Sequence, residues 1–444
     1  SKLKRALRLH HDAAVGPLFE PYVKKFNETY APLRLETSYV TQDYYGTTQT
    51  QLAGGSVDYD VLFTDAGYLE KWYQAGWIRP LDGLPGIDAI LGAMQPGTDA
   101  SLRASDGKLL ALPYYVGTDI FMYNADHLGQ IGAQPPGTWE EMLDQCRELK
   151  SKGIVQTPYS PFWTKDFSMM WYQLLDCALS DGAGPFFDDK VKPVFQDDPV
   201  VVKTVERWKT MYDEGLVPKD IMTTDYGNTV NVFAGGKSSF THQYQLELVG
   251  FNNPKSSQVA GKAKIALFPG STHKTLSSPA YWHMTASTPD PDAAWQLMTY
   301  LAAKDKTGDL YVPRQLIALD LGLGTPYPEV NGADAVKTAW SKWCDVDILL
   351  QQIENSTQVG PASNQAWFPK FQETIAAALQ DAVLGRTKVP DALKQAADFA
   401  TELTTVLKAL PQECHCLVLA RGALIGSIPP ARDLTPDVRR RLGL

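Results

Sequence analysis

The sequence LRLHHDAAVGPLFEPYVKKFNETYAPLRLETSYVTQDYYGTTQTQLAGGSVDYDVLFTDA, residues 7–66, decides the fold. It opens with a short apolar strand at 7–9 that stops at the pair of histidines, and residues 17–30 then carry apolar side chains at helical spacing. A second strand is expected over 33–40, a polar helix over 44–52 and a short buried strand over 60–63. This alternation predicts an α/β fold with a parallel sheet and helices on its faces.

Length and charge narrow the possibilities. The chain has 444 residues, which exceeds the roughly 250 to 300 residues that one hydrophobic core supports, so more than one domain is expected. Asp and Glu outnumber Lys and Arg by 50 to 41, which argues against nucleic acid as a partner. No apolar stretch is long enough to cross a bilayer. The chain opens at Ser1 without a cationic and apolar leader, which fits an exported protein whose signal peptide has been removed, or a trimmed chain.

A second domain follows a crossover segment. Residues 108–124, KLLALPYYVGTDIFMYN, form an extended run that Pro113 interrupts, and we interpret this run as the crossover. Thr138 and Glu141 then form a capping-box signature for a helix over 138–152. Further elements are expected as helices at 169–179, 200–214, 291–303, 365–384 and 390–410, and strands at 238–241, 264–268 and 282–286. Residues 411–444, with Cys414, His415 and Cys416 and a basic end, differ in character and are interpreted as an extension or tag.

Enzyme and metal motifs are incomplete. Gly236-Lys237-Ser238 resembles the end of a phosphate-binding loop, but Asn231 stands where the first glycine is required. No nucleophile elbow or HExxH motif occurs. His10, His11 and Asp12 are adjacent residues whose side chains would diverge, so we expect no metal site and no cofactor. A glycosidase-type pair of carboxylates stays open, and so does a disulfide between Cys146 and Cys177.

Aromatic residues beside polar groups suggest a ligand. Trp163, Tyr244, Trp282 and Trp367 are each expected in turns or loops next to hydroxyl, amide, imidazole or carboxyl groups. Sugar rings pack their C–H faces on aromatic rings while their hydroxyls need planar polar partners, so such positions suit a polyhydroxylated ligand. Simple packing in the core or on the surface is the alternative for each tryptophan.

The order of segments resembles the extracellular solute-binding proteins of carbohydrate ABC transporters, the maltose-binding-protein-like family. The resemblance rests on seven stretches in collinear order: QLAGGSVDYDVLF at 51–63, GWIRPLD at 76–82, LPYYVGTDIFMYNADHL at 112–128, TWEEMLDQCRELKSKG at 138–153, FAGGKSSF at 233–240, PDPDAAWQLMTYLA at 289–302 and VLGRTKVPDALKQAA at 383–397.

This resemblance implies a two-lobed periplasmic-binding-protein fold with a hinge and a ligand cleft between the lobes. The N-terminal lobe would comprise 1–113 and 264–312, and the C-terminal lobe 114–263 and 313–410. The implied function is the substrate-binding component of an ABC importer, without catalysis, which captures a sugar, polyol or small glycoside for membrane permease subunits. We expect a monomer in the periplasm or anchored to the cell surface as a lipoprotein. The alternatives are a carbohydrate-active enzyme and a sensor that docks to a receptor.

The resemblance also implies ligand-binding residues. They lie at strand ends, on the crossover, on second-lobe loops, on the returning strand and at two later positions: His11, Asp12, Thr41, Gln42, Asp43, Asp65, Tyr114, Gly117, Asp119, Trp163, Gln243, Tyr244, Tyr281, Trp282, Arg314 and Trp367. Arg314 departs from the Pro-Thr-Arg-like turn of the family, and His11 is not a family constant. An acidic ligand would be indicated if Arg314 or Lys165 reached the cleft.

Overall fold

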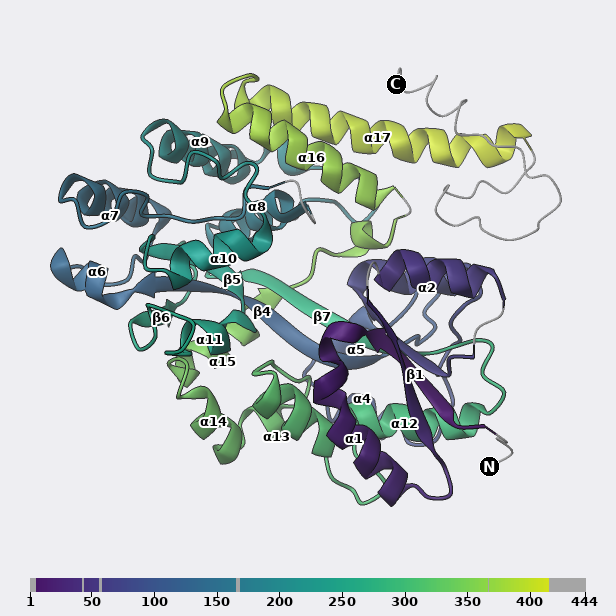
Figure 1. Ribbon diagram of the computed structural model, residues 1–444. Helices are drawn as coiled ribbons and strands as arrows, with labels where there is room; N and C mark the ends of the chain where they lie inside the picture. Colours follow the sequence, from purple (N-terminus) through teal and green to yellow (C-terminus); the bar gives the residue numbers. More distant parts are fainter. Residues whose placement is uncertain (1–4, 42–43, 56–57, 165–167, 366, 415–444) are drawn as a thin grey trace. The chain divides into compact units, whose positions relative to one another are not determined.

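The computed structural model describes residues 5–41, 44–55, 58–164, 168–365 and 367–414 (Figure 1). Contacts divide these residues into two compact units. Unit 1 combines residues 5–116 with 279–337, and unit 2 combines 117–278 with 338–414. The chain passes between the units along two long strands, β4 (Leu112–Asn124) and β7 (Thr275–Met284), and again within helix α14 (Asp334–Trp340).

Unit 1 is built on a mixed sheet. β1 (Leu7–Asp12) pairs in parallel with both β2 (Leu35–Val40) and β3 (Val61–Asp65), and β3 pairs antiparallel with β7. Because β1 and β3 are parallel, their carboxyl ends lie at the same edge of the sheet. The other elements of unit 1 are η1 (Ala13–Val15), α1 (Gly16–Thr29), α2 (Tyr44–Ala53), η2 (Ala66–Tyr68), α3 (Leu69–Gln74), α4 (Ile87–Gly92), α5 (Thr98–Ser101), α12 (Pro291–Ala302), η5 (Pro313–Asp320) and α13 (Pro328–Asn331).

Unit 2 is mainly helical around a small antiparallel sheet. β4 pairs with β5 (Phe240–Tyr244) on one side and with β6 (Ala263–Ala266) on the other. β7 also pairs with the short strand β8 (Ser356–Thr357). The helices of unit 2 are α6 (Ala125–Gln130), α7 (Trp139–Ser151), α8 (Met169–Ser180), η4 (Phe195–Asp197), α9 (Pro199–Asp213), α10 (Tyr226–Ala234), α11 (Glu247–Phe251), α15 (Val346–Glu354), η6 (Pro361–Asn364), α16 (Phe368–Val383) and α17 (Val389–Cys414).

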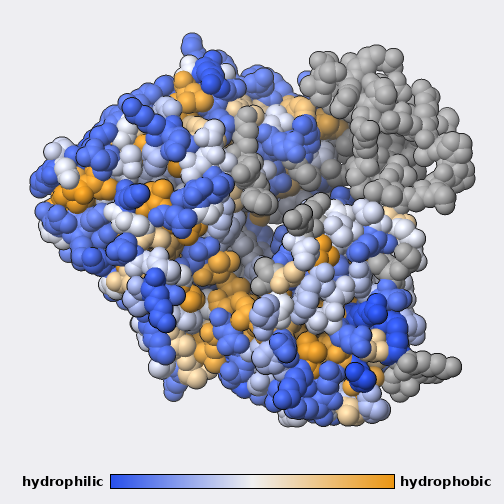
Figure 2. All heavy atoms as spheres, viewed as in Figure 1, coloured by the Kyte–Doolittle hydropathy of each residue, from blue (hydrophilic) through white to orange (hydrophobic). Residues whose placement is uncertain are grey.

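Local sequence signals explain several of these boundaries. The Thr138 hydroxyl accepts the Glu141 backbone N–H, and the Glu141 carboxylate accepts the Thr138 N–H, so the predicted capping box starts α7. The Asp198 carboxylate accepts the Val200 backbone N–H and so caps α9, with Pro199 at the first helical position. The apolar faces of α7, α8, α9, α16 and α17 meet in one large core. Figure 2 shows that the visible surface is mostly hydrophilic, and no described helix is long and apolar enough to cross a membrane.

Two local expectations were wrong. β1 does not stop at Leu9 but continues to Asp12, because His10 and His11 keep pairing with β2. The returning strand covers 275–284 instead of 282–286, since its residues 280–284 pair with β3 and its first residues with β8. The helix over residues 313–320 was not predicted.

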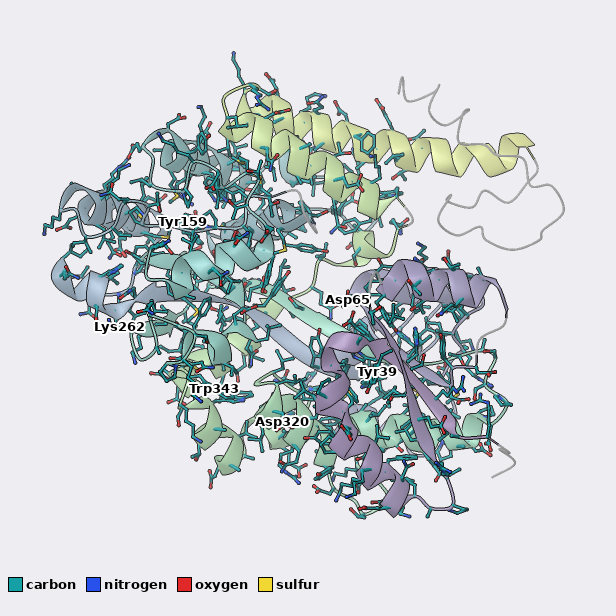
Figure 3. The ribbon with its side chains drawn as sticks, viewed as in Figure 1. Tyr39, Asp65, Tyr159, Lys262, Asp320 and Trp343 are labelled. Atoms are coloured by element: carbon teal, nitrogen blue, oxygen red, sulfur yellow. The ribbon has the colours of Figure 1, made fainter. Side chains whose placement is uncertain are left out.

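The division into units differs in its boundaries from the expected lobes. Residues 264–278 belong to unit 2, and residues 313–337 belong to unit 1. The second placement follows from contacts with α1 and α12: the Tyr22 hydroxyl donates to the Asp320 carboxylate at 2.6 Å, and the Tyr327 hydroxyl donates to the Ala302 carbonyl at 2.6 Å. Figure 3 labels Asp320 in this segment. Gln42, Asp43, Lys165 and residues 415–444 lie outside the described residues.

Candidate functional site

In unit 1, polar side chains gather where β1 and β3 end. Asp12 ends β1 and Asp65 ends β3, where Figure 3 labels it. Asp65 precedes η2, but its carboxylate makes no capping hydrogen bond and is exposed. The backbone N–H of Asp65 donates to the Tyr45 hydroxyl at 2.8 Å, and the Tyr45 ring stacks on Tyr68 with 3.8 Å between centroids. This edge of the sheet therefore offers a carboxylate beside two tyrosine rings.

An aromatic cluster lies beside this edge. The His11 ring stacks on Phe63 with 4.0 Å between centroids, and Tyr114 lies 4.2 Å from Trp282 and 5.5 Å from His11. Burial lowers the pKa of His11 to about 3, so the ring is neutral near pH 7. His11 Nε2 and Trp282 Nε1 are buried and have no hydrogen-bond partner among the described residues. Buried polar atoms in proteins are normally satisfied, so this cluster retains hydrogen-bonding capacity.

In unit 2, residues of β4, β5 and α8 line a small cavity of about 10 Å³. That is about the space of one water-sized group. Asp119 on β4 pairs in register with Tyr244 on β5, and Gln243 is the next residue of the same strand. The lining residues are Asp119, Phe162, Met169, Tyr172, Gln173, Asp176, His242, Gln243 and Tyr244. The cavity thus combines aromatic rings with amide and carboxyl groups.

A row of three rings leads to this cavity. Phe162 stacks on Tyr226 with 4.8 Å between centroids, and Tyr226 stacks on Tyr244 at 6.1 Å. The Tyr226 hydroxyl donates to the Glu247 carboxylate at 2.7 Å, which fixes the ring. Tyr244 is only half-buried, so part of its ring is available to a ligand.

A larger cavity of about 460 Å³ also lies in unit 2, between the 218–225 loop and α10. Its polar groups are largely engaged in local turns: the hydroxyls of Thr223 and Thr224 donate to the Asp220 carbonyl, and the Asp225 carboxylate caps α10 at Asn228. Unlike the small cavity, its lining includes no buried polar atom that lacks a partner. We therefore place the candidate ligand-binding residues of unit 2 at the small cavity.

The structure brings some of the expected residues together. His11, Tyr114 and Trp282 share the cluster in unit 1, and Asp119, Gln243 and Tyr244 share the cavity in unit 2. Three further residues of the set lie near these groups along the chain. Thr41 is exposed after β2, Tyr281 is buried opposite Thr64 on β3, and Gly117 is the buried first residue of unit 2.

Three expected residues lie elsewhere, in packing or paired environments. Trp163 is fully buried against Trp208, with 5.2 Å between ring centroids. Trp367 is buried in the same hydrophobic core. The Arg314 guanidinium forms two hydrogen bonds of 2.8 Å with the Asp309 carboxylate. Packing and pairing account for Trp367 and Arg314 without a ligand, whereas Trp163 Nε1 is buried and has no hydrogen-bond partner among the described residues.

Sequence reasoning missed several cavity residues. Asp176, Gln173 and Tyr172 line the cavity from α8, and Tyr226, which stacks on the lining residue Tyr244, begins α10. One signal was available for Asp176, because it is the only acid in a helix whose other buried residues are mostly apolar. Buried acids are seldom found without a partner, so such a residue marks a site worth examining.

Metal binding and disulfide formation find no support in the described residues. No cluster of three or more His, Cys, Asp or Glu side chains that could hold a metal ion occurs in the described part of the chain. Cys146 and Cys177 are both free thiols in the core of unit 2, so the disulfide between them that the sequence left open does not form.

Comparison with known proteins gives a consistent picture. Residues 12–307 match the model of a family described as bacterial extracellular solute-binding proteins. The chain is 23% identical over 202 residues to a probable ABC transporter-binding protein of Deinococcus radiodurans, covering 44% of this chain and 47% of the relative. It is 20% identical over 309 residues to an erythritol/L-threitol-binding protein of Mycolicibacterium smegmatis, covering 65% and 64%. The chain therefore spans about half to two thirds of these curated relatives.

The fold comparison covers more of the chain. Maltose-bound MalE3 of T. maritima matches with a TM-score of 0.74 at 19% identity, over 90% of this chain and 99% of that structure. At this identity the match carries the fold alone. It confirms the predicted fold class, an α/β chain with the two-lobed architecture of periplasmic sugar-binding proteins.

Proposed function

This chain belongs to the family of bacterial extracellular solute-binding proteins, and we propose on that basis that it captures an uncharged sugar or polyol for an ABC importer. The observation that carries the proposal is the cavity of unit 2, where Asp119, Gln243 and Tyr244 combine hydrogen-bonding groups with an aromatic ring. Hydroxyls of a polyhydroxylated ligand would bond to the carboxyl and amide groups while its C–H surface packs on the ring. In unit 1, Asp65, His11 and Trp282 offer the same combination.

The charges at both groups of residues favour a ligand without negative charge. The cavity contains the carboxyls of Asp119 and Asp176, and the edge of unit 1 adds those of Asp12 and Asp65. A phosphate or carboxylate ligand would be repelled by these groups and normally requires Arg, Lys or a helix N-terminus. Arg314, one of the two cations that would have indicated an acidic ligand, is already paired with Asp309, and the other, Lys165, lies outside the described residues.

The names of relatives support the role, and they include both neutral and charged ligands. One curated relative is named as binding erythritol and L-threitol, another as binding mannitol, and a matching structure holds maltose, whereas a relative of Agrobacterium fabrum is named as binding sn-glycerol-3-phosphate. These curated relatives are named as binding proteins, which favours capture over the carbohydrate-active enzyme that the sequence left open. We further propose that the protein is exported, works as a monomer in the periplasm or at the cell surface, and delivers its ligand to permease subunits. Ligand-driven closure of the two lobes stays a prediction of the family resemblance.

A thermal-shift screen followed by product analysis tests the proposal. The probes are erythritol, ribitol, D-mannitol, glucose and maltose, with sn-glycerol 3-phosphate and gluconate as charged comparators. A ligand that binds only the folded state stabilises it by about 2.7 kcal/mol at 100 times its Kd, so the melting temperature rises. We expect a neutral probe to give the largest rise and to be recovered intact. Stabilisation by the anions alone would overturn the ligand class, and a chemically altered probe would favour the enzyme.

A further inference from the structure

Two buried carboxyl groups face each other in unit 2. Asp119 on β4 is 6% exposed and Asp176 on α8 is 2% exposed. Both side chains line the same cavity of about 10 Å³, and neither makes an ion pair with a described Lys or Arg. Two negative charges confined to so small a buried space repel each other, so the ionised form of one of the two acids is disfavoured and that acid holds a proton.

The surrounding donors locate the proton on Asp119. The Asp176 Oδ1 atom accepts hydrogen bonds from the Thr275 hydroxyl at 2.8 Å and from the Leu276 backbone N–H at 3.0 Å. Among the described residues, the donor to the Asp119 carboxyl is the Ser278 hydroxyl, at the longer distance of 3.5 Å. Because donors stabilise an ionised carboxylate, Asp176 is the member that holds the negative charge. Burial and the neighbouring charge raise the pKa of Asp119 well above its ordinary value, and burial raises the pKa of Asp176 to about 6.

The histidine, tyrosine and cysteine side chains around the pair are neutral near pH 7. On β5, burial lowers the pKa of His242 to about 3 and raises that of Tyr244. On α10 and α8, burial raises the pKa values of Tyr226 and Cys177. Burial also raises the pKa of Tyr159, which precedes α8 in sequence, and the Glu247 carboxylate accepts the Tyr226 hydroxyl beside the cavity. The shared charge of Asp119 and Asp176 therefore dominates the electrostatics of the cavity.

An independent observation indicates that this cavity accepts a ligand. Gln243 is 2% exposed and lines the same cavity as the two acids. Its Nε2 donates to the Thr241 hydroxyl at 2.8 Å, but its Oε1 has no hydrogen-bond partner among the described residues. A buried acceptor without a donor costs roughly 1–3 kcal/mol, and a ligand hydroxyl would relieve that cost.

We propose that Asp176 is a positioning residue for ligand recognition: it holds Asp119 as a neutral acid whose free carbonyl oxygen, with Gln243 Oε1, accepts hydrogen bonds from ligand hydroxyls. This inference rests on the proposed function and extends it, since two uncharged acceptors side by side select an uncharged polyol or sugar. Asp176 also anchors β7 through Thr275 and Leu276, so the pair links the two strands along which the chain enters and leaves unit 2.

The proton assignment is tested without any ligand. The infrared spectrum of the unliganded wild-type protein at pH 7.5 should contain the carbonyl stretching band of a protonated carboxylic acid. The spectrum of Asp119→Asn under the same conditions should lack this band. Asp213→Asn, an exposed acid of unit 2 paired with Lys209, should leave the band unchanged. Circular dichroism and the melting temperature confirm that each variant is folded. A wild-type spectrum without the band, or a band that persists in Asp119→Asn, would overturn the assignment.

Binding is then measured by calorimetry with erythritol, D-mannitol and maltose at pH 5 and pH 7.5. Asp119→Asn imitates the neutral acid and has no titratable group at this position, so its affinity should be the same at both pH values. Asp176→Asn removes the charge that keeps Asp119 protonated, so affinity should fall about 10-fold at pH 7.5 and recover at pH 5.

A purely structural role for Asp176 predicts an equal loss at both pH values, and a loss of about 100-fold in Asp119→Asn would mean that Asp119 binds as a carboxylate. Either result overturns the proposal. If the wild-type protein binds none of the three probes, the proposed function fails, and so does the inference that Asp119 and Gln243 accept ligand hydroxyls. The infrared result still decides the proton assignment in that case.

Discussion

Arg5 and Asp60 form a two-point ion pair within unit 1. Arg5 Nη1 donates to Asp60 Oδ2 at 2.8 Å, and Arg5 Nη2 donates to Asp60 Oδ1 at 3.1 Å. The Asp60 side chain is fully buried, and it also accepts the Arg8 backbone N–H at 2.8 Å and the Thr288 hydroxyl at 2.6 Å. One carboxylate therefore joins β1, the segment before β3 and the segment after β7, which are far apart in sequence.

Replacing this carboxylate should destabilise unit 1. Asp60→Ala leaves the Arg8 N–H and the Thr288 hydroxyl without a buried partner, so we expect the free energy of unfolding to fall by about 3 kcal/mol. The matched control is Asp58→Ala, because Asp58 is exposed and forms only a 3.7 Å ion pair with Arg8. That control should cost less than about 1 kcal/mol. Chemical denaturation of both variants checks the difference, and equal losses would contradict the role given to Asp60.

Trp163 should behave as a core residue. Its ring is fully buried against Trp208 and Tyr159, so Trp163→Ala should lower the free energy of unfolding by about 3–5 kcal/mol. The milder Trp163→Phe keeps an aromatic ring and should remain folded. Its affinity for the best neutral probe should equal that of the wild-type protein. A selective loss of affinity in Trp163→Phe, with stability unchanged, would return Trp163 to the ligand-binding set.

Where the determinants were local, the sequence was sufficient to predict the structure. Thr138 and Glu141 are three residues apart, and together they start α7 as predicted. The apolar spacing of residues 17–30 and the buried run at 60–63 likewise yielded α1 and β3. The extent of β1 was not predictable in this way, since His10 and His11 extend the strand through pairing with residues about 28 positions away.

The candidate site depends on longer-range contacts. Trp163 and Trp367 have polar neighbours in sequence just as Tyr244 does, but their rings pack in the core of unit 2. Nothing local separates these cases, because Trp163 is buried against Trp208 and Trp367 against Phe187, which lie elsewhere in the chain. The role of Asp176 depends on Asp119 and Thr275, which are 57 and 99 positions away from it. Arg314 had a nearer explanation in Asp309, which sequence reasoning overlooked.

Tyr244 should contribute to affinity more than to stability. Its ring is half-buried beside the cavity and stacks on Tyr226. Tyr244→Ala removes the face on which a ligand would pack, so we expect affinity to fall about 10-fold or more, equivalent to at least about 1.4 kcal/mol. Tyr73→Ala is the control, because Tyr73 lies in unit 1 and bonds only to Asp106. Calorimetry with the best neutral probe measures the affinity of both variants. If Tyr244→Ala binds the probe as tightly as Tyr73→Ala, Tyr244 does not belong to the proposed site.

His11 should make unit 1 sensitive to acid. Burial lowers the pKa of its ring to about 3, below the ordinary value of 6.5, so the unfolded chain binds a proton at a pH where the folded protein does not. The stability from a neutral His11 is therefore complete above about pH 6.5 and is lost as the pH falls towards 3, by about 1.4 kcal/mol per pH unit. His11→Phe keeps a ring against Phe63 but has no titratable group. Between pH 7.5 and pH 5, the free energy of unfolding of this variant should fall by about 2 kcal/mol less than that of the wild-type protein. Chemical denaturation at the two pH values measures the difference. The other buried histidines are present in both proteins, so their contributions cancel in the comparison. If the free energy of unfolding falls by the same amount in both proteins, His11 is not a neutral, buried residue.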